Sequence, residues 1–487
     1  MLLQLEELDR ELLSMFDSVL LYGYKPEYSP VLEYMLLQGV DGAKIELCLR
    51  PMQLWDYVKE KPRTLVVAII STWNEETVIK NACASQNTCT LVLITGADYT
   101  PRVINMTLAE FEQRHAAYAD AGNTYQENKD FSSFSPKVKA LAYYLPQFHE
   151  TKENNEWWGE GFTEWTNTKK SLPRFAGHYQ PRTPHDDIGY YDLSDVETLR
   201  CQATLAKEHG IYGFCVYYYW FSGRRILEKP IDLLLRHPEI DFPFCFLWAN
   251  ENWTRTWADK DDVVLLSQNY RDEDPELFID DLKKYFDDER YIRHDGKPIL
   301  QVYRLAQIPN VRNVIARWRN RAREIGIGEL YIIGTDWLDN IDTLNISDAL
   351  DAKAFFGFYH NHIEFSKFLV ANTFWAYDYG DHAKKAMTHI KTRSDDLTTY
   401  HATLLNWDNA PRYNQVFASL DFRFSFRAFY EWLRVIADDA VENEKAFMFI
   451  NAWNEWAESS CLEPDARYGY AALNTVARAL CGLPFDG

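Results

Sequence analysis

Eight apolar, strand-like segments after residue 139 are the feature that most constrains the fold of this chain. Stretches with the spacing of amphipathic helices, such as residues 193–210 and 311–326, separate most of them. Eight strand–helix units over this length predict a (β/α)8 TIM barrel with a packed interior. The eight segments are residues 140–148, 213–221, 244–253, 298–304, 330–337, 352–358, 402–409 and 446–456.

The first 122 residues show a different rhythm, in which short apolar runs alternate with helical pieces. This pattern predicts a small Rossmann-like α/β domain with a parallel sheet. The turn after its first strand has one glycine, Gly23, and no GxGxxG pattern, so it gives little support for dinucleotide binding. The alternative is a packing or partner-docking module. Residues 123–139 are polar and predict a linker, and residues 140–487 form the barrel.

Charge and cysteine usage exclude several classes of partner. The formal net charge is −21 with no basic run, so the chain is expected to repel nucleic acid and anionic membranes. No apolar stretch is long enough to span a bilayer, and the N-terminus lacks the basic region of a signal peptide. The eight cysteines form no CxxC pair. Reduced thiols and a cytoplasmic location are therefore expected.

Aromatic residues are abundant, with 16 Trp, 30 Tyr and 28 Phe. Flat rings stack on the apolar faces of sugars, whereas a large aromatic core is the structural alternative. Polar and aromatic side chains gather where the predicted strands end, which is the functional face of such a barrel. The candidate substrate-binding residues are Tyr144, His149, Tyr218, Tyr219, Trp220, Asn250, Glu251, Asn252, Asp336, Trp407, Asp408, Asn451, Trp453 and Asn454.

The stretch NAWNEWAESS, after the last strand, carries Glu455 and Glu458. In a turn or short helix, residues three apart share a face, so both carboxylates are expected to reach one ligand. Glycosyl transfer needs an acid for the leaving oxygen and a second carboxylate as base or nucleophile. Trp453 and Trp456 would lower the local dielectric and raise a carboxyl pKa. The alternative is that these acids cap or salt-bridge a helix start.

Other candidates have structural alternatives. An ion pair with Arg255 is the alternative for Glu251, and a buried aromatic core is the alternative for the run from Tyr218 to Trp220. For Asp408 and its neighbour, a turn into Pro411 is the alternative. The histidines lack the spacing of zinc ligands, so no metal and no cofactor are expected.

Five stretches together resemble a known family. They are YYLPQFHETKENNEWWGEGFTEW, YGFCVYYYWF, LWANENWTRTW, NWDNAPR and WNEWAE. The region from Lys139 to Gly487 is similar to the WbsX-like proteins of bacterial polysaccharide loci. These proteins resemble the endo-α-mannosidases of glycoside hydrolase family 99.

The resemblance implies a retaining mechanism without a protein nucleophile. Glu455 would deprotonate the 2-hydroxyl of the sugar, which closes a 1,2-anhydro ring, and Glu458 would act as acid and then as base. This chemistry requires a 2-hydroxyl trans to the leaving group, as in α-mannosides and α-rhamnosides. The insertion ENNEWWGEGFTEW departs from the mannosidases and implies a different donor-side pocket.

The sequence thus predicts a retaining enzyme that cleaves or transfers α-linked sugars of an oligosaccharide or polysaccharide. The alternative is a glycosyltransferase of bacterial surface polysaccharide biosynthesis, although no diphosphate-binding motif is present. A carbohydrate-binding protein without catalysis is a third hypothesis, but it would not require both Glu455 and Glu458. The N-terminal domain is expected to recruit a partner enzyme or a second copy.

Overall fold

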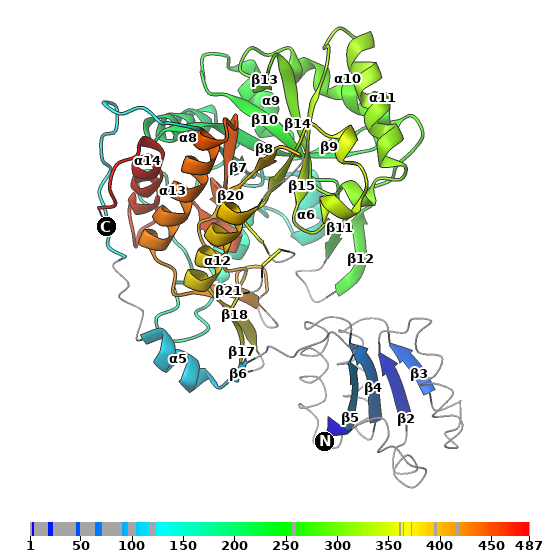
Figure 1. Ribbon diagram of the computed structural model, residues 1–487, viewed down its shortest axis with the longest axis vertical. Helices are drawn as coiled ribbons and strands as arrows, with labels where there is room; N and C mark the ends of the chain where they lie inside the picture. The colour runs from blue at the N-terminus through cyan, green and yellow to red at the C-terminus, as the bar shows by residue number, and fades with distance from the viewer. Residues whose placement is uncertain are drawn as a thin grey trace. The chain divides into compact units, whose positions relative to one another are not determined.

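The computed structural model describes most of the chain from Ile104 onward and isolated strands before it. The chain divides into two compact units, Met1–Asn105 and Met106–Gly487 (Figure 1). The described residues are 2–3, 18–22, 45–48, 64–70, 90–95, 104–116, 123–255, 260–359, 362–363, 365–371, 373–393, 397–413 and 418–486.

The N-terminal unit contains a parallel sheet with the strand order β1-β5-β4-β2-β3. Four of its strands, β2 to β5, lie in the short apolar runs of this region, at residues 18–24, 43–49, 64–71 and 89–96. The segments between them, the turn at Gly23 and the predicted domain boundary at residue 122 lie outside the described residues. The Rossmann-like class therefore stays a prediction. The strands are β1 (Leu2–Leu3), β2 (Ser18–Tyr22), β3 (Ile45–Cys48), β4 (Thr64–Ile70) and β5 (Thr90–Thr95).

The larger unit is built on a nearly closed, barrel-like parallel sheet. Its strand order is β19-β16-β15-β14-β10-β8-β7-β22-β20. Only His401 separates β19 from β20, so residues 399–404 pair with β16 on one side and with β22 on the other. Each of the eight predicted apolar segments overlaps one strand, and the short strand β19 (Thr399–Tyr400) precedes the seventh segment. The eight strands are β7 (Lys139–Tyr144), β8 (Ile211–Phe221), β10 (Phe244–Trp248), β14 (Lys297–Val302), β15 (Tyr331–Asp336), β16 (Ala352–Phe355), β20 (Ala402–Leu404) and β22 (Phe447–Asn451).

The interior of this sheet is packed and not open. The strands are nearly continuous apolar runs because both of their faces are buried, and every residue of β10 is buried. Inside, Gln301 donates hydrogen bonds to the hydroxyls of Tyr143, at 3.0 Å, and Thr335, at 2.9 Å. A filled interior leaves the strand ends as the place for a ligand.

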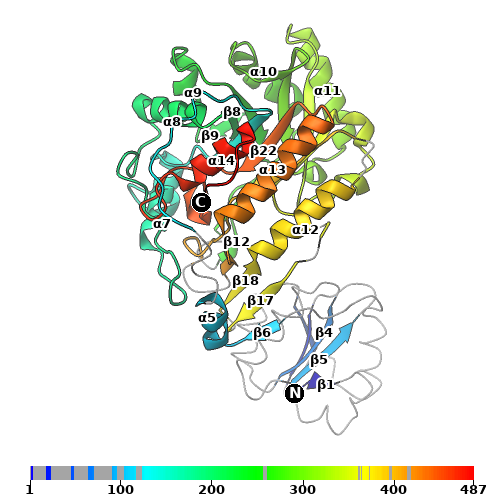
Figure 2. The same cartoon turned by 60° about the vertical axis from the view of Figure 1, so that its left-hand side comes forward.

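Amphipathic helices cover the outside of the sheet, and Figure 2 shows α12, α13 and α14 side by side. The predicted helices at residues 193–210 and 311–326 contain α8 and α11. These helices are α8 (Val196–Glu208), α9 (Lys229–Arg236), α10 (Asp274–Phe286), α11 (Val311–Glu324), α12 (Tyr379–Thr392), α13 (Phe426–Glu442) and α14 (Ala471–Cys481). None of the described helices is long and apolar enough to cross a membrane.

The connection between β15 and β16 departs from the predicted strand–helix repeat. Residues 337–351 contain two 3-10 helices, η6 (Ile341–Thr343) and η7 (Ser347–Ala349), in place of an α-helix.

Segments outside the barrel repeat build the rims of the larger unit. The predicted linker packs onto the C-terminal region, because the amide of Gln126 donates to Tyr468 and its carbonyl accepts from Tyr470. The rim elements are β6 (Ile104–Met106), α5 (Leu108–Ala116), α6 (Lys152–Trp158), α7 (Glu164–Lys170), β9 (Arg224–Ile226), β11 (Trp253–Arg255), β12 (Lys260–Leu266), β13 (Arg293–His294), η5 (Leu305–Gln307), β17 (Lys367–Val370), β18 (Phe374–Asp378) and β21 (Ala418–Phe422).

Candidate active site

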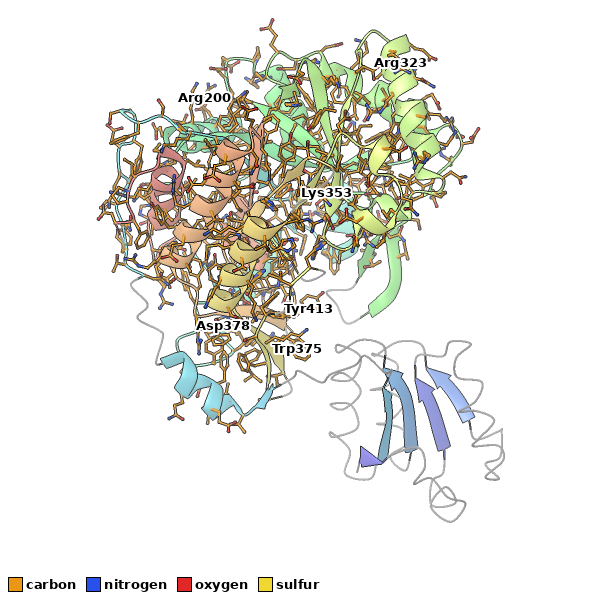
Figure 3. All side chains as sticks on the ribbon, in the orientation of Figure 1. Arg200, Arg323, Lys353, Trp375, Asp378 and Tyr413 are labelled. Atoms are coloured by element: carbon orange, nitrogen blue, oxygen red, sulfur yellow. The ribbon has the colours of Figure 1, made fainter. Side chains whose placement is uncertain are left out.

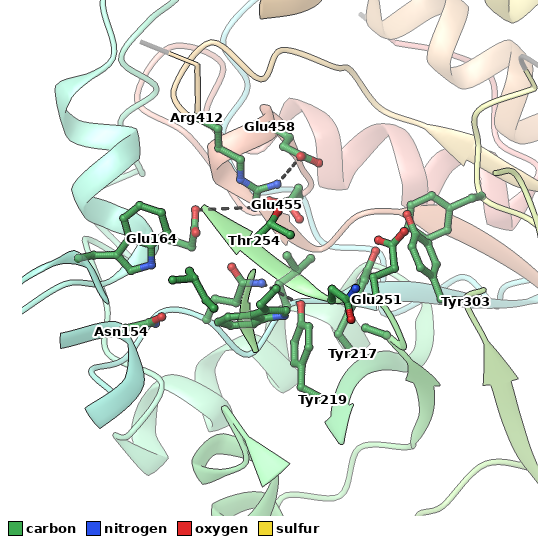
Figure 4. A pocket seen from close by; sticks show the side chains of 18 of the residues that line it. Asn154, Glu164, Tyr217, Tyr219, Glu251, Thr254, Tyr303, Arg412, Glu455 and Glu458 are labelled. Carbon is green, nitrogen blue, oxygen red and sulfur yellow. Dashed lines mark hydrogen bonds and ion pairs between the residues drawn. The ribbon is translucent and has the colours of Figure 1, made fainter. Parts of the chain in front are cut away.

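A pocket lies at the C-terminal ends of the barrel strands, where the sequence predicted a site (Figure 4). Polar groups on its wall include four carboxyl groups and one guanidinium. Aromatic rings from six strand ends supply much of the remaining wall. The charged residues are Glu164, Glu251, Arg412, Glu455 and Glu458, and the rings from the strand ends are Tyr217, Tyr219, Trp253, Tyr303, Trp337, Phe356 and Trp407.

A tight hairpin after β22 presents the two predicted catalytic glutamates. Its strands β23 (Asn454–Glu455) and β24 (Ser460–Cys461) are antiparallel and are joined by the 3-10 helix η8 (Trp456–Glu458). Side chains three residues apart are eclipsed in a 3-10 helix. Glu455 and Glu458 therefore both reach the pocket, as the spacing predicted, although the turn is not an α-helix.

The guanidinium of Arg412 holds both carboxylates. Its Nη2 donates to Oε1 of Glu455 at 2.8 Å, and its Nη1 donates to Oε1 of Glu458. The same Nη2 lies 3.7 Å from Oε2 of Glu164 (Figure 4). The two glutamates therefore form salt bridges, which was the structural alternative, and they also line the pocket. One buried cation thus pairs with the two glutamates of the hairpin and lies near a third acid, Glu164, from a distant part of the chain.

Burial dominates the electrostatics of this cluster. Burial raises the pKa of Glu455 well above its ordinary value; Arg412 opposes this increase, while Glu458 and Glu164 add to it. Burial likewise raises the pKa of Glu458 and of Glu164 against the effect of Arg412. Three buried carboxyl groups around one guanidinium favour an arrangement in which at least one of them is protonated.

The two tryptophans of the motif point away from the pocket. The indole N–H groups of Trp453 and Trp456 donate to the carboxylate of Glu463, at 3.0 and 2.7 Å. Tyr191 and Gln202 donate to the same carboxylate at 2.8 and 2.6 Å. Burial raises the pKa of Glu463 to about 7, against these hydrogen bonds. Trp453 therefore braces the hairpin from behind and does not line the pocket.

Strand β8 divides its aromatic run between two sides. Tyr219 lines the pocket, where its hydroxyl accepts a hydrogen bond from Gln147 at 2.8 Å. Tyr218 and Trp220 lie on the opposite side: the Tyr218 hydroxyl donates to Asp281 of α10, and the Trp220 ring lies 5.1 Å from Phe278. The sequence missed Tyr217, which lines the pocket because strand residues two apart share a face.

Of four further predicted binding residues, three line the pocket and one does not. Glu251, Asn252 and Trp407 lie on the pocket wall. Glu251 pairs with Arg304 at 2.5 Å, and the side chain of Arg255, the partner considered above, is outside the described residues. Asn250 is buried and instead holds the backbone of Arg304, through its amide nitrogen at 2.8 Å and its amide oxygen at 2.8 Å.

Several predicted binding residues brace the loops that carry the pocket. Asn454 is fully buried and exchanges two hydrogen bonds with the backbone of Leu145, at 2.8 and 2.9 Å. Asn451 donates to the carbonyl of Phe356 at 3.0 Å. Tyr144 donates to Gln202, which belongs to the network behind the hairpin. These residues do not line the pocket, because buried groups take up their polar atoms: backbone groups bind the two asparagines, and a side-chain amide binds Tyr144.

Asp408 and Asp336 also lie outside the pocket wall. Asp408 contacts Nε2 of His178 at 2.8 Å, and its amide donates to the carbonyl of Glu458 at 2.8 Å, so it supports the catalytic hairpin. Asp336 is buried beside His362, at 3.1 Å, and Lys353, which Figure 3 labels in the interior.

His149 is buried away from the pocket, and burial lowers its pKa to about 4. It is therefore neutral at neutral pH. Within the part of the chain that the structure describes, no group of three or more His, Cys, Asp or Glu side chains is arranged to hold a metal ion.

Besides Tyr217, two charged candidates were missed although they lie inside the stretches that carried the resemblance. Arg412 ends NWDNAPR, and Glu164 is the last acid of the insertion. The only signal in the sequence was that Arg412, a basic residue, follows a predicted strand end that also carries polar residues. Their meeting with Glu455 depends on the paths of two loops, which spacing along the chain does not reveal.

Comparisons with known proteins add the family context. The family model described as glycosyltransferase WbsX matches residues 140–476. Two WxcX proteins from strains of Xanthomonas campestris pv. campestris, themselves described as uncharacterized, are 38% identical over 358 residues, which cover 71% of this chain and 50% of theirs. The chain thus spans about half the length of these curated relatives.

Solved structures give weaker matches. An endo-α-mannosidase from Bacteroides thetaiotaomicron is 14% identical with a TM-score of 0.43, covering 70% of this chain and 95% of its own. A glycoside hydrolase-like protein is 15% identical with a TM-score of 0.46, covering 74% of this chain and 99% of its own.

Proposed function

The chain belongs to the WbsX glycosyltransferase family, and from this premise we propose that it is a retaining enzyme that cleaves or transfers α-linked sugars at Glu455 and Glu458. The observation that carries the proposal is a pair of carboxylates on one buried guanidinium, with Glu455 buried and the Glu458 side chain 17% exposed, at the end of the last barrel strand. A binding protein would gain nothing from holding two acids in this desolvated state, because burying charge is costly.

The proposed first step uses both acids. Glu455 takes the proton of the 2-hydroxyl while O2 attacks the anomeric carbon from the face opposite the leaving group. The bond from that carbon to the leaving oxygen breaks, and Glu458 gives its proton to this oxygen. A 1,2-anhydro sugar results. Burial raises the pKa of both acids, and more strongly that of Glu455, so the coupled pair retains a proton near neutral pH, as the acid role requires. The division of roles between Glu455 and Glu458 follows the family resemblance.

The second step reverses the roles. Glu458 now takes a proton from water or from an acceptor hydroxyl, whose oxygen attacks the anomeric carbon. The anhydro ring opens, and O2 recovers its proton from Glu455. Two inversions give net retention. Arg412 orients both carboxylates through both steps. The substrates that satisfy this geometry have a 2-hydroxyl trans to the leaving oxygen, as in α-mannosides and α-rhamnosides.

The charges of the pocket favour a neutral glycan over a nucleotide sugar. Four carboxyl groups line the wall, and Arg412 and Arg304, the guanidinium groups beside them whose side chains the structure describes, are already engaged with glutamates. A diphosphate would meet repulsion there. A second candidate function, a glycosyltransferase of bacterial surface polysaccharide, is favoured by the family description. The experiment must therefore establish whether the acceptor in the second step is water or another sugar.

The test incubates the purified protein with α-mannosyl and α-rhamnosyl oligosaccharides, with and without nucleotide sugars, and follows the products by mass spectrometry and NMR. We expect shortened or rearranged glycans without any nucleotide sugar, retention at the anomeric carbon, and no turnover of 2-deoxy analogues. Extension that requires a nucleotide sugar would establish the transferase instead. An inverted product would exclude the anhydro-sugar mechanism.

A further inference from the structure

Glu164 is a third acid of the pocket that the proposed mechanism does not use. Its side chain comes from α7, within the insertion that departs from the mannosidase pattern, and it lies on the pocket wall (Figure 4). The residue is only 4% exposed. Its Oε2 has no hydrogen-bond partner among the described residues, and Nη2 of Arg412 lies beyond hydrogen-bonding distance at 3.7 Å.

Rigid packing fixes the backbone of Glu164. The next residue, Trp165, packs its ring 5.5 Å from that of Trp456 in η8, and its indole N–H donates to the carbonyl of Tyr191 at 2.7 Å. Thr163 and Thr166 form a reciprocal capping box, which stabilises the start of α7. The unpaired oxygen of Glu164 is therefore held in place beside the catalytic hairpin.

A buried carboxyl oxygen without a hydrogen-bond partner costs free energy of folding. Such groups are retained where a bound ligand supplies the missing partner. Burial raises the pKa of Glu164, which favours the neutral acid. A neutral carboxyl group has one hydrogen to donate and free lone pairs to accept. A sugar hydroxyl has the matching pair of functions, whereas a carboxylate or phosphate of a ligand would meet the neighbouring acids.

We propose that Glu164 is a specificity-determining residue that binds one sugar hydroxyl, other than the 2-hydroxyl, of the glycan held against Glu455 and Glu458. The proposal rests on the proposed function for the identity of the ligand. It assigns a role to the insertion: α7 brings to the pocket a hydrogen-bonding group that selects among sugars with the same 2-hydroxyl. Arg412 then couples this recognition to the two catalytic acids, because its Nη2 lies between Glu164 and Glu455.

The test compares the parent protein with Glu164→Ala and Glu164→Gln on glycosides that lack one hydroxyl at a time, at positions 3, 4 and 6. We expect one position at which deoxygenation lowers kcat/KM of the parent about tenfold or more, because the buried carboxyl is left unpaired. In Glu164→Ala, removal of the same hydroxyl should lower kcat/KM less than about threefold. In Glu164→Gln the decrease in kcat/KM should lie between those of the parent and Glu164→Ala. Glu160→Gln, an exposed acid of the same insertion, is the matched control and should behave as the parent.

Equal penalties in the parent and Glu164→Ala at every position would overturn the proposal, and a uniform fall in kcat/KM would show a structural role only. Saturation-transfer NMR of glycan binding to the full chain separates this inference from the proposed function. Binding that depends on one hydroxyl through Glu164, without turnover, would leave the inference standing and contradict the enzymatic proposal. Neither binding nor turnover of any glycan in the panel would overturn both.

Discussion

Two buried carboxylate sites lie on opposite sides of one hairpin, residues 453–463, and they are built differently. On the pocket side, Glu455 and Glu458 share the guanidinium of Arg412. On the other side, Glu463 accepts hydrogen bonds from two indoles, one phenol and one amide, all of them neutral. Both sites are desolvated. The first lines the pocket, whereas Glu463 is 2% exposed and lies behind the hairpin.

The difference separates chemistry from support. Four neutral donors around one carboxylate fix two tryptophans and leave no lone pair direction for a ligand. A guanidinium shared by two carboxylates orients them while each keeps an oxygen for substrate. We therefore expect substitutions on the pocket side to change turnover and the pH dependence of stability. Substitutions behind the hairpin should mainly change stability.

The largest effect on stability should come from Arg412→Met, which removes the cation and leaves three buried acids. Breaking a buried ion pair costs roughly 3–5 kcal/mol, because uncompensated buried charge remains. The acids of the variant should also take up protons, so its stability should fall more steeply as pH rises than that of the parent. Urea unfolding at several pH values measures both effects.

The matched control for this variant is Arg312→Gln. Arg312 pairs with Asp348, but the two side chains are 53% and 73% exposed. An exposed pair contributes about 0–1 kcal/mol. A loss in Arg412→Met as small as that in the control would mean that the cluster is solvated and that its acids are ordinary surface groups.

A smaller loss is expected for Glu463→Gln. The amide has one oxygen instead of two, so at least one indole N–H loses its acceptor, at a cost of about 1–3 kcal/mol. Turnover, measured on the glycan that the panel identifies, should fall less than in any pocket variant. A loss of turnover with unchanged stability would contradict the assignment of this side as support.

The cost of Glu463→Gln should depend on pH. Because the folded pKa of Glu463 is raised to about 7, the folded state binds more protons than the unfolded state between about pH 4.5 and 7. The parent therefore loses stability as pH rises through this range, whereas the amide does not titrate. The difference in unfolding free energy between parent and variant should be larger at pH 5 than at pH 8. A difference independent of pH would show that four hydrogen bonds outweigh burial and keep the folded pKa near its ordinary value.

Much of the fold followed from the apolar pattern, because each of the eight segments that was long and apolar overlaps a strand. The missing α-helix after β15 could not be predicted, since residues 337–351 were treated as one more repeat. Strand β8 shows another limit. Its residues are apolar or aromatic on both faces, so the sequence could not decide whether Tyr218 or Tyr219 lines the pocket.

The site was predictable where it follows one strand and unpredictable where loops meet. Glu455 and Glu458 are close in sequence, and a turn suffices to bring both to one wall. Arg412 and Glu164 come from other parts of the chain, and only the folded loops place them beside the pair. Asparagines such as Asn454 were expected to bind substrate, but buried backbone groups compete for the same amides.

The measurement that tests the central claim most directly compares Glu458→Gln with Glu455→Gln on two leaving groups, a sugar and a dinitrophenolate, attached to the α-glycoside that the panel identifies. A sugar leaving group needs a proton and a dinitrophenolate does not. We predict that Glu458→Gln lowers kcat/KM about 10²–10⁴-fold for the sugar and little for the dinitrophenolate, while Glu455→Gln lowers both. Unchanged turnover of the sugar substrate by Glu458→Gln, or equal losses for both leaving groups, would contradict the account.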